Sequence, residues 1–199
     1  MFDCGADPAA INAHLAADPL LRPLVERRPG LRLASAWDPF EMAVRAILGQ
    51  QISVAGATTI AGRLVARHGT PLAVISGGLT HLFPSPQTVA DADLDGLGLS
   101  VKRAATVKNF AAAVASGELV LDAPLGVEDF VARLVALPGI GPWTAHYVAM
   151  RALGEPDGFP ATDLGLKHAM PEVDLAVRSE KWRPWRSYAA LHLWASLND

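Results

Sequence analysis

The 199-residue chain is predicted to be all-α. Alanine is abundant, and the runs of β-branched and aromatic residues that are typical of strands are few. Ser or Asp recurs immediately before stretches whose apolar residues follow helical spacing. Pro and Gly mark short connections between these stretches. We therefore expect helix after helix and no strand hairpin.

The first well-marked helix is predicted to begin after Asp38, with Asp38 as the N-cap and proline at the first helical position. Its apolar face is formed by Phe40, Ala43, Val44, Ile47 and Leu48. The segment 49–53, Gly-Gln-Gln-Ile-Ser, interrupts this pattern. Ser53 can cap a second helix that runs through Val65, so two helices should meet at a short break.

Later helices follow from the same signals. Ser85 and Ser100 are candidate N-caps, and Gly117 lies beyond the end of the helix that Ser100 begins. Five further helices are expected at about residues 86–94, 101–116, 127–136, 143–151 and 184–196.

Composition excludes more than it identifies. The net charge of −3 does not indicate a nucleic-acid partner, although DNA responds to the local field of one face and not to the total charge. Cys4 is the single cysteine, which excludes a disulfide framework, and the histidines show no metal-ligand spacing. The start lacks the pattern of a signal peptide, and no apolar run has the length of a membrane span. We expect a cytoplasmic protein without a membrane partner.

The segment 137–143, Leu-Pro-Gly-Ile-Gly-Pro-Trp, is predicted to be a tight turn between two helices. Gly139 and Gly141 allow positive φ and close approach of another backbone, and Pro142 suits a first helical position. The N–H groups at such a helix start can bind a phosphate. A simple αα-turn is equally consistent with this segment alone. Asp163, which follows a loop rich in Gly and Pro, adds a carboxylate downstream.

These features together resemble the helix-hairpin-helix, Gly/Pro-rich loop and aspartate of base-excision DNA glycosylases. Four further segments resemble the DNA-3-methyladenine glycosylase II family: residues 40–53 (FEMAVRAILGQQIS), 83–86 (FPSP), 102–104 (KRA) and 181–189 (KWRPWRSYA). Several motifs in one order make the resemblance specific.

The resemblance implies a two-lobed helical fold with a cleft between the lobes. Residues 38–155 would form the middle lobe with the helix-hairpin-helix, and residues 1–37 and 156–199 the second lobe. Many members carry an N-terminal mixed α/β domain. The chain is expected to lack it, as a minimal member or a fragment of a longer protein.

The resemblance also implies an active site. Asp163 matches the catalytic aspartate, whose charge would stabilise a sugar cation and which can also orient water. An ordinary helix N-cap uses the same oxygens. Trp143, Tyr147 and Trp194 match the aromatic residues of the base pocket, where a cationic alkylated purine would stack. Core packing is the alternative for each aromatic residue.

DNA contacts are implied at Gln50, Gln51, Gly139, Ile140 and Gly141. Gln51 matches the wedge that fills the space of a flipped base, where the family's pattern has an apolar residue, and Gln50 competes for this role. The family also binds a monovalent cation, here through the main-chain carbonyls of Val135, Leu137 and Ile140. No other cofactor is expected.

The expected function is that of a monofunctional glycosylase that removes bases such as 3-methyladenine and 7-methylguanine from double-stranded DNA, as a monomer. Strand-nicking relatives have a lysine just after the hairpin, where this chain has Trp143. Two alternatives remain. One is a non-catalytic helix-hairpin-helix module that binds the DNA backbone, and the other is a helical protein-interaction domain.

Overall fold

The computed structural model describes residues 1–121 and 126–199, apart from the side chain of Ser76, and these residues are mostly helical. The helices are α1 (Pro8–Ala16), α2 (Arg22–Arg27), α3 (Pro39–Leu48), α4 (Val54–His68), α5 (Pro86–Asp91), α6 (Val101–Ala115), α7 (Val127–Val135), α8 (Pro142–Val148), the π-helix η1 (Ala149–Leu153), α9 (Leu164–Ala169), α10 (Leu175–Arg178), the 3-10 helix η2 (Ser179–Trp182) and α11 (Arg186–Ser196). The strands are β1 (Thr70–Ser76) and β2 (Leu79–Leu82). The predicted helical class is confirmed.

Four predicted N-caps are also confirmed. The Asp38 carboxylate accepts hydrogen bonds from the backbone N–H groups of Phe40, at 2.8 Å, and Glu41, at 3.1 Å. Ser53, Ser85 and Ser100 each accept a hydrogen bond from the N–H three residues further on. These polar side chains satisfy amides that a helix start leaves without a partner.

Three helix boundaries differ from the prediction. Helix α5 ends at Asp91 because Asp93 forms a turn, accepting the N–H of Asp95 at 3.0 Å. Helix α8 ends at Val148 and is followed directly by the π-helix η1, where the carbonyl of Arg151 accepts the N–H of Ala36 at 2.8 Å. Helix α11 begins at Arg186, two residues later than expected.

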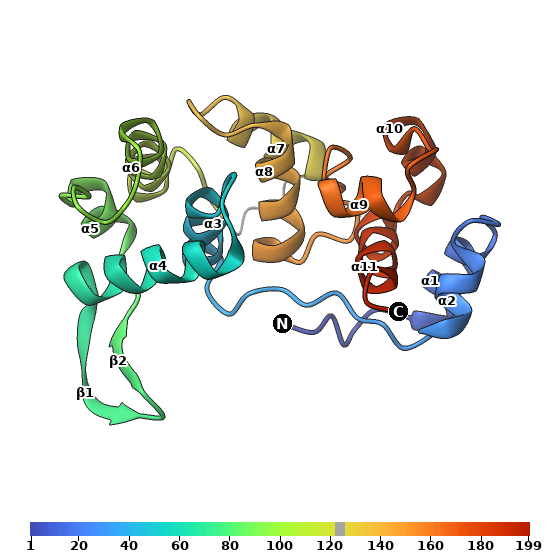
Figure 1. Ribbon diagram of the computed structural model, residues 1–199, viewed down its shortest axis with the longest axis horizontal. Coiled ribbons are helices and arrows are strands. Elements are labelled where there is room, and N and C mark those ends of the chain that lie inside the picture. Colours follow the sequence, from blue (N-terminus) through green and yellow to red (C-terminus); the bar gives the residue numbers. More distant parts are fainter. Residues whose placement is uncertain (122–125) are drawn as a thin grey trace.

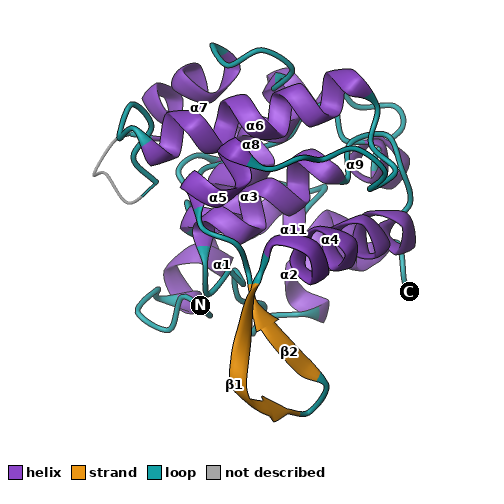
Figure 2. Ribbon diagram, turned by 90° about the vertical axis from the view of Figure 1, so that its left-hand side faces the viewer, coloured by secondary structure: helices purple, strands orange, loops and turns teal. Residues whose placement is uncertain are grey.

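The expectation of no strand hairpin is wrong. Strands β1 and β2 pair antiparallel, with Thr70 opposite Leu82, and project from the end of α4 (Figure 2). Gly77 and Gly78 have φ values of 56° and 84°, which a two-residue turn of the I′ type requires. Val74 and Ile75 remain 77% and 68% exposed, so the hairpin buries no apolar face that would produce an alternating pattern.

Two hydrophobic clusters support the fold. One joins buried residues of α3 to α8, among them Ile47 and Phe110. The other joins residues of α1 and α2, such as Leu15, to residues of α9 to α11, such as Leu193. Figure 1 shows the segment after α2 crossing the molecule to reach α3, so α1 and α2 lie beside α11, far from α3. The boundaries of the two lobes stay a prediction.

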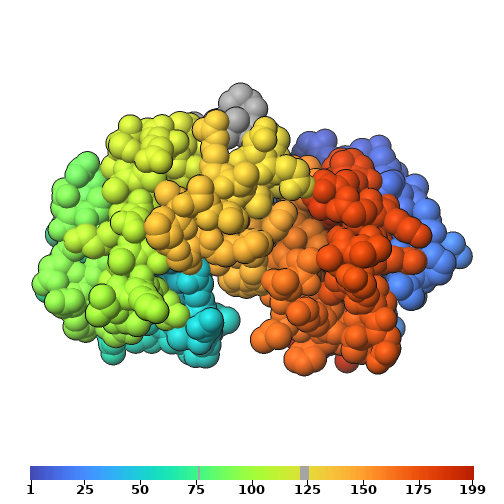
Figure 3. Space-filling view, turned by 90° about the horizontal axis from the view of Figure 1, so that it is seen from above, coloured from blue at the N-terminus to red at the C-terminus, as the bar shows by residue number. Residues whose placement is uncertain are grey.

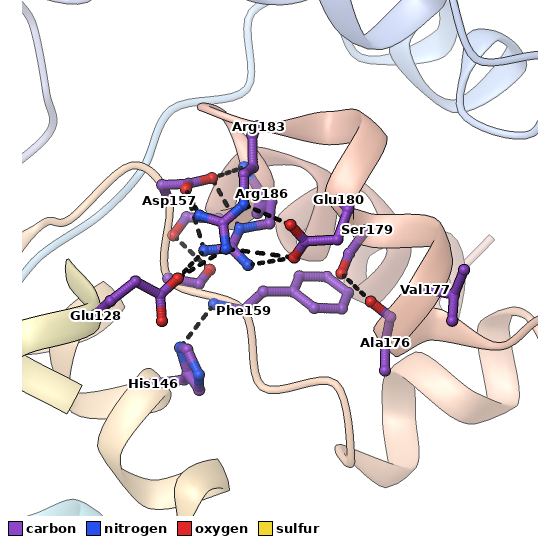
Figure 4. Close-up of polar contacts among 12 residues, drawn as sticks. Glu128, His146, Asp157, Phe159, Ala176, Val177, Ser179, Glu180, Arg183 and Arg186 are labelled. Atoms are coloured by element: carbon purple, nitrogen blue, oxygen red, sulfur yellow. Dashed lines mark hydrogen bonds and ion pairs between the residues drawn. The ribbon is translucent and has the colours of Figure 1, made fainter. Parts of the chain in front are cut away.

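A cluster of charged residues joins α7 to α11 (Figure 4). We call it the arginine cluster; it consists of Arg183 and Arg186 with Glu128, Asp157 and Glu180. Arg186 is 5% exposed and pairs with Asp157 at 2.9 Å, while Glu128 of α7 accepts from Arg183 at 2.7 Å. The hydrogen bond from Arg183 holds the pKa of Glu128 below its usual value. The cluster therefore fixes the hairpin-bearing helix α7 to the C-terminal helices.

Candidate active site in the cleft

A cleft of about 1130 Å³ separates the α3–α4 turn from the start of α9. Its lining comes from four places: α3 with the turn into α4 and the first turns of α4, the turn between α7 and α8, one face of α8, and residues 162–164. Figure 3 shows the hollow at its lower edge, between the atoms coloured cyan near residue 50 and those coloured orange near residue 160. Segments separated by more than a hundred residues in sequence thus face one another.

The turn between α7 and α8 depends on one glycine in a left-handed conformation. Gly139 has a φ of 90°, and a Cβ built there would lie 2.0 Å from Oγ1 of Thr106. Gly141 has a φ of −93°, and a Cβ there would meet nothing within 4 Å. The expectation of positive φ therefore holds for Gly139 and is wrong for Gly141. Ile140 between them is buried.

The break between α3 and α4 is attached to this turn through Gln50. Its side-chain amide donates to the carbonyl of Gly139 at 3.2 Å and to Oγ1 of Thr144 at 2.9 Å. The Gln50 carbonyl accepts from the guanidinium of Arg103. Gln51, by contrast, is exposed and adopts a φ of 57°, which few residues other than glycine tolerate. Both residues line the cleft, but the Gln50 side chain is hydrogen-bonded to the protein and Gln51 is exposed.

Asp163 is a helix N-cap and a cleft residue at once. Its Oδ1 accepts the N–H of Leu166 at 3.0 Å, which caps α9. The same oxygen accepts the indole N–H of Trp194 at 2.8 Å, and Oδ2 accepts that of Trp143 at 2.8 Å. Three donors therefore hold the carboxylate, and it still lines the cleft. The capping interpretation and the site interpretation of the sequence are compatible.

The three aromatic residues of the predicted pocket lie together. Trp143 and Tyr147, one turn apart on α8, are stacked with ring centroids 5.2 Å apart and planes at 13°. Tyr147 meets the ring of Trp194 edge-on, at 6.3 Å and 64°. Trp143 and Tyr147 line the cleft, and Trp194 is half-buried beside Tyr147, with its indole N–H on Asp163.

Several cleft residues were missed from the sequence. Leu164, the first residue of α9, is 72% exposed, and Thr162 and Arg45 also line the cleft. An apolar residue that directly follows Asp163 at a helix start was the available signal for Leu164. Arg45 is one of several scattered basic residues that could form a DNA-facing surface, but the sequence did not distinguish it from ordinary charged residues on helix surfaces.

The proposed cation ligands offer carbonyl oxygens of the right kind. Within the described backbone, no hydrogen bond outside the helices uses the carbonyl of Val135 or Ile140, while that of Leu137 accepts the N–H of Ile140 at 3.2 Å. Carbonyl oxygens are suitable ligands for a hard cation, so the donor set fits. Across residues 1–121 and 126–199 no group of three or more His, Cys, Asp or Glu residues is placed to bind a metal ion. The described helices also include none with the length and apolar character needed to cross a membrane.

Comparison with known proteins agrees with this geometry. Residues 44–184 match the HhH-GPD superfamily base excision DNA repair protein family, and residues 1–38 match the AlkA N-terminal domain. The expectation that the chain lacks an N-terminal domain needs one change, because residues 1–38 match the AlkA N-terminal domain.

Two relatives span nearly the whole chain. The chain is 47% identical, over 99% of its own length, to the Mycobacterium tuberculosis protein named "Probable bifunctional transcriptional activator/DNA repair enzyme AlkA", of which it spans 41%. It is 39% identical, over 98% of its length, to DNA-3-methyladenine glycosylase 2 of Escherichia coli, of which it spans 68%. Among solved structures, the 3-methyladenine DNA-glycosylase of Archaeoglobus fulgidus superposes with a TM-score of 0.75 at 28% identity, over 94% of this chain and 68% of that one.

Proposed function

This chain belongs to the HhH-GPD superfamily of base excision DNA repair proteins, and on that premise we propose that it excises alkylated bases from double-stranded DNA. The reaction is hydrolysis of the N-glycosidic bond of bases such as 3-methyladenine and 7-methylguanine. The observation that carries the proposal is the Asp163 carboxylate held beside two stacked aromatic rings in one cleft.

Asp163 supplies the negative charge that the reaction needs. Breaking the bond leaves positive charge on the sugar, and a fixed carboxylate beside it stabilises that transition state. Three N–H donors fix the position and orientation of the carboxylate at the cleft. Asp163 therefore acts mainly through its charge and the orientation of water.

The rings of Trp143 and Tyr147 supply the surface for the base. An alkylated purine must leave the base stack before the sugar can reach Asp163. Because such a base carries positive charge, it is attracted to the electron-rich faces of aromatic rings. We assign Gln51 as the wedge that enters the vacated space, since Gln50 is already hydrogen-bonded to the hairpin.

The turn between α7 and α8 binds the phosphate backbone of the DNA. Gly141 precedes α8 without a side-chain cap, so the backbone there is open to a phosphate oxygen. The carbonyls of Val135, Leu137 and Ile140 would hold a monovalent cation that bridges to the same phosphate. Phosphate contacts position the enzyme and carry no information about the lesion.

We further assign a monofunctional enzyme that acts as a monomer in the cytoplasm. A lyase reaction requires an amine that attacks the sugar, and Trp143 occupies the position after the hairpin. Borohydride should therefore trap no covalent adduct between the protein and lesion DNA. A strong adduct that requires the lesion would assign the chain to the glycosylase/lyase class instead.

The test of the function is release of methylated bases from alkylated duplex DNA in single turnover. Asp163→Asn should lower the excision rate by about 10²–10³-fold, because the sugar cation loses its countercharge. Asn keeps an oxygen that can cap α9, and its amide nitrogen cannot accept the indole N–H of Trp143, so DNA binding should persist and melting should fall slightly. Asp174→Asn is the matched control, since Asp174 caps α10 in the same lobe outside the cleft. If wild type binds duplex but releases no base, the non-catalytic DNA-binding module is the correct alternative.

A further inference from the structure

We infer that Arg103 is a positioning residue for Gln51, because it holds the peptide group that directs the Gln51 side chain into the cleft. Arg103 is half-buried in the first turn of α6 and contacts the turn between α3 and α4. The inference rests on the proposed function, since it explains how the residue assigned as the wedge is held in place.

Gln51 has a backbone conformation that its surroundings must stabilise. Its φ of 57° lies in the left-handed region, which residues with a side chain adopt rarely and at a cost in free energy. Such conformations persist where neighbouring contacts determine them. Gln51 is itself exposed at the cleft, so the stabilising contacts have to come from the residues beside it.

Arg103 stabilises this conformation at the peptide bond that precedes Gln51. Its Nη2 donates to the carbonyl oxygen of Gln50, which lies in the same planar peptide group as the N–H of Gln51. Rotating that group, as a negative φ at Gln51 requires, would turn the carbonyl oxygen away from the guanidinium. The hydrogen bond therefore favours the left-handed conformation of Gln51 over the extended and right-handed helical ones.

The burial of Arg103 supports a specific role for its guanidinium. The Nε atom is buried and has no hydrogen-bond partner in the described structure. A buried donor without a partner destabilises the folded state, whereas an apolar side chain at this position would avoid that cost. The hydrogen bond to the Gln50 carbonyl offsets it, since a charged donor forms a stronger bond than a neutral one.

Helix α6 contacts the turn between α7 and α8 as well. Thr106 lies three residues after Arg103 on the same face of α6, and a Cβ built on Gly139 would lie 2.0 Å from its Oγ1. Gln50 completes a ring of contacts, because its side-chain amide donates to the carbonyl of Gly139 at 3.2 Å. One face of α6 therefore fixes both DNA-facing turns relative to each other.

Arg103→Met tests the role, because it removes the guanidinium and keeps an unbranched side chain. Single-turnover excision from paired duplex should slow by about tenfold, the factor expected for Gln51→Ala, since the wedge loses its orientation. The double variant Arg103→Met/Gln51→Ala should be no slower than Gln51→Ala alone, because the two residues act as a unit.

Arg63→Met is the matched control. Arg63 also donates to a main-chain carbonyl, that of Leu97 at 3.1 Å, and lies in α4 away from the cleft lining. This variant should excise at the wild-type rate. Arg103→Lys is a second test variant, which keeps the charge and loses the planar guanidinium, so it should restore excision only in part.

Binding measurements separate positioning from a direct contact between Arg103 and DNA. Loss of an arginine that contacts a phosphate weakens binding to undamaged duplex and lowers the salt slope by about one. If Arg103 acts through Gln51, neither quantity should change in Arg103→Met.

A fluorescence measurement follows the wedge without requiring catalysis. The probe is 2-aminopurine placed opposite an abasic-site analogue, because its fluorescence rises when its stacking is disrupted. Saturating wild-type protein should raise this fluorescence. The increase should be smaller with Arg103→Met and Gln51→Ala, and unchanged with Arg63→Met.

Three results would overturn the inference. The first is wild-type excision and wild-type fluorescence in folded Arg103→Met. The second is weaker binding to undamaged duplex with a shallower salt dependence, which would make Arg103 a phosphate ligand. The third is a double variant in which the two losses multiply, which would show that Arg103 acts independently of Gln51.

None of these results contradicts the proposed function, because wild-type excision and its loss in Asp163→Asn are measured separately. If the wild-type protein binds duplex but releases no base, the proposed function fails, and the fluorescence measurement still tests Arg103.

Discussion

At the scale of single residues, the same side chain serves structure and chemistry. Asp163 caps α9 and accepts two indole N–H groups with the oxygens that would face a sugar cation. Gln50 and Gln51 differ from Asp163, because the structural contact and the exposed cleft position belong to two neighbouring residues. Gln50 holds the hairpin and Gln51 is exposed in the cleft.

Gln51→Ala should slow excision from paired duplex by about tenfold, since filling the vacated space offsets a few kcal/mol of unstacking. Excision from single-stranded DNA should change much less, because no stack has to be opened there. Single-turnover assays on matched duplex and single strands measure both. Gln50→Ala is the comparison, and it should lower stability through the lost contacts to Gly139 and Thr144. Equal losses on both substrates would remove Gln51 from the wedge role.

His192 predicts how stability depends on pH. It is 1% exposed on α11, and burial lowers its pKa from 6.5 to about 4. Between these values the unfolded chain binds a proton that the folded chain does not, so stability is complete above pH 6.5 and falls as pH drops toward 4. The loss is at most about 3 kcal/mol. Urea unfolding across this range should show a weaker pH dependence in His192→Gln, and an identical slope would assign the effect to other groups.

At the scale of elements, local chemistry predicted most of what the structure contains. Asp38, Ser53 and Ser100 cap the helices they were expected to cap, because a cap needs only its own neighbours in sequence. The π-helix η1 could not be predicted, because the Arg151 carbonyl accepts a hydrogen bond from the N–H of Ala36, which is far away in the sequence. The β1–β2 hairpin could have been predicted from Gly77-Gly78 between apolar runs.

In the candidate site, too, features carried by short sequence motifs could be predicted and those that depend on packing could not. The hairpin and Asp163 could be identified from the sequence, since short motifs carry them. The contacts of Trp194 with Asp163 and Tyr147 could not, because they depend on how α11 packs against the preceding helices. Which hairpin glycine is conformationally required was equally hidden, as Thr106 of α6 decides it.

Substitutions of Gly139 and Gly141, in the turn between α7 and α8, should have different effects. Gly139→Ala introduces strain at positive φ and a clash with Thr106, so it should lower the free energy of unfolding by about 1–3 kcal/mol. Gly141→Val has open space, so melting should stay near wild type. Its side chain should instead obstruct the phosphate, weakening binding to abasic and undamaged duplex alike and making the salt dependence shallower. A folded Gly141→Val variant with undiminished binding would reduce the hairpin to a turn.

At the scale of the whole molecule, the arginine cluster fixes helix α7 against helix α11. It reaches from Glu128 of α7 to Asp157 in the loop that leads to Asp163 (Figure 4). Its members differ in exposure: the Glu128 side chain is 59% exposed and that of Asp157 11%. Solvent screens the first and not the second.

Asp157→Asn should therefore lower the free energy of unfolding by roughly 3 kcal/mol, because it leaves the buried Arg186 without its closest charged partner. Glu128→Gln should cost about 1 kcal/mol or less. Denaturant unfolding of both variants measures the difference. Since the pKa of Glu128 is lowered, its small contribution exists above the unfolded pKa and disappears as pH falls through the lowered value. Equal costs for the two variants would contradict the role of burial.

The second hydrophobic cluster has a consequence for how the protein is made. Leu15 of α1 and Leu193 of α11 share that cluster, and Tyr188 donates to Asp3 at 2.6 Å. During translation the first two helices leave the ribosome long before their packing partners exist, and the wait is on the order of ten seconds at ordinary synthesis rates. Contacts of such long range also slow folding. The second hydrophobic cluster is thus the last to assemble, and Asp163 lacks its Trp194 partner in the nascent chain until synthesis of α11 is finished.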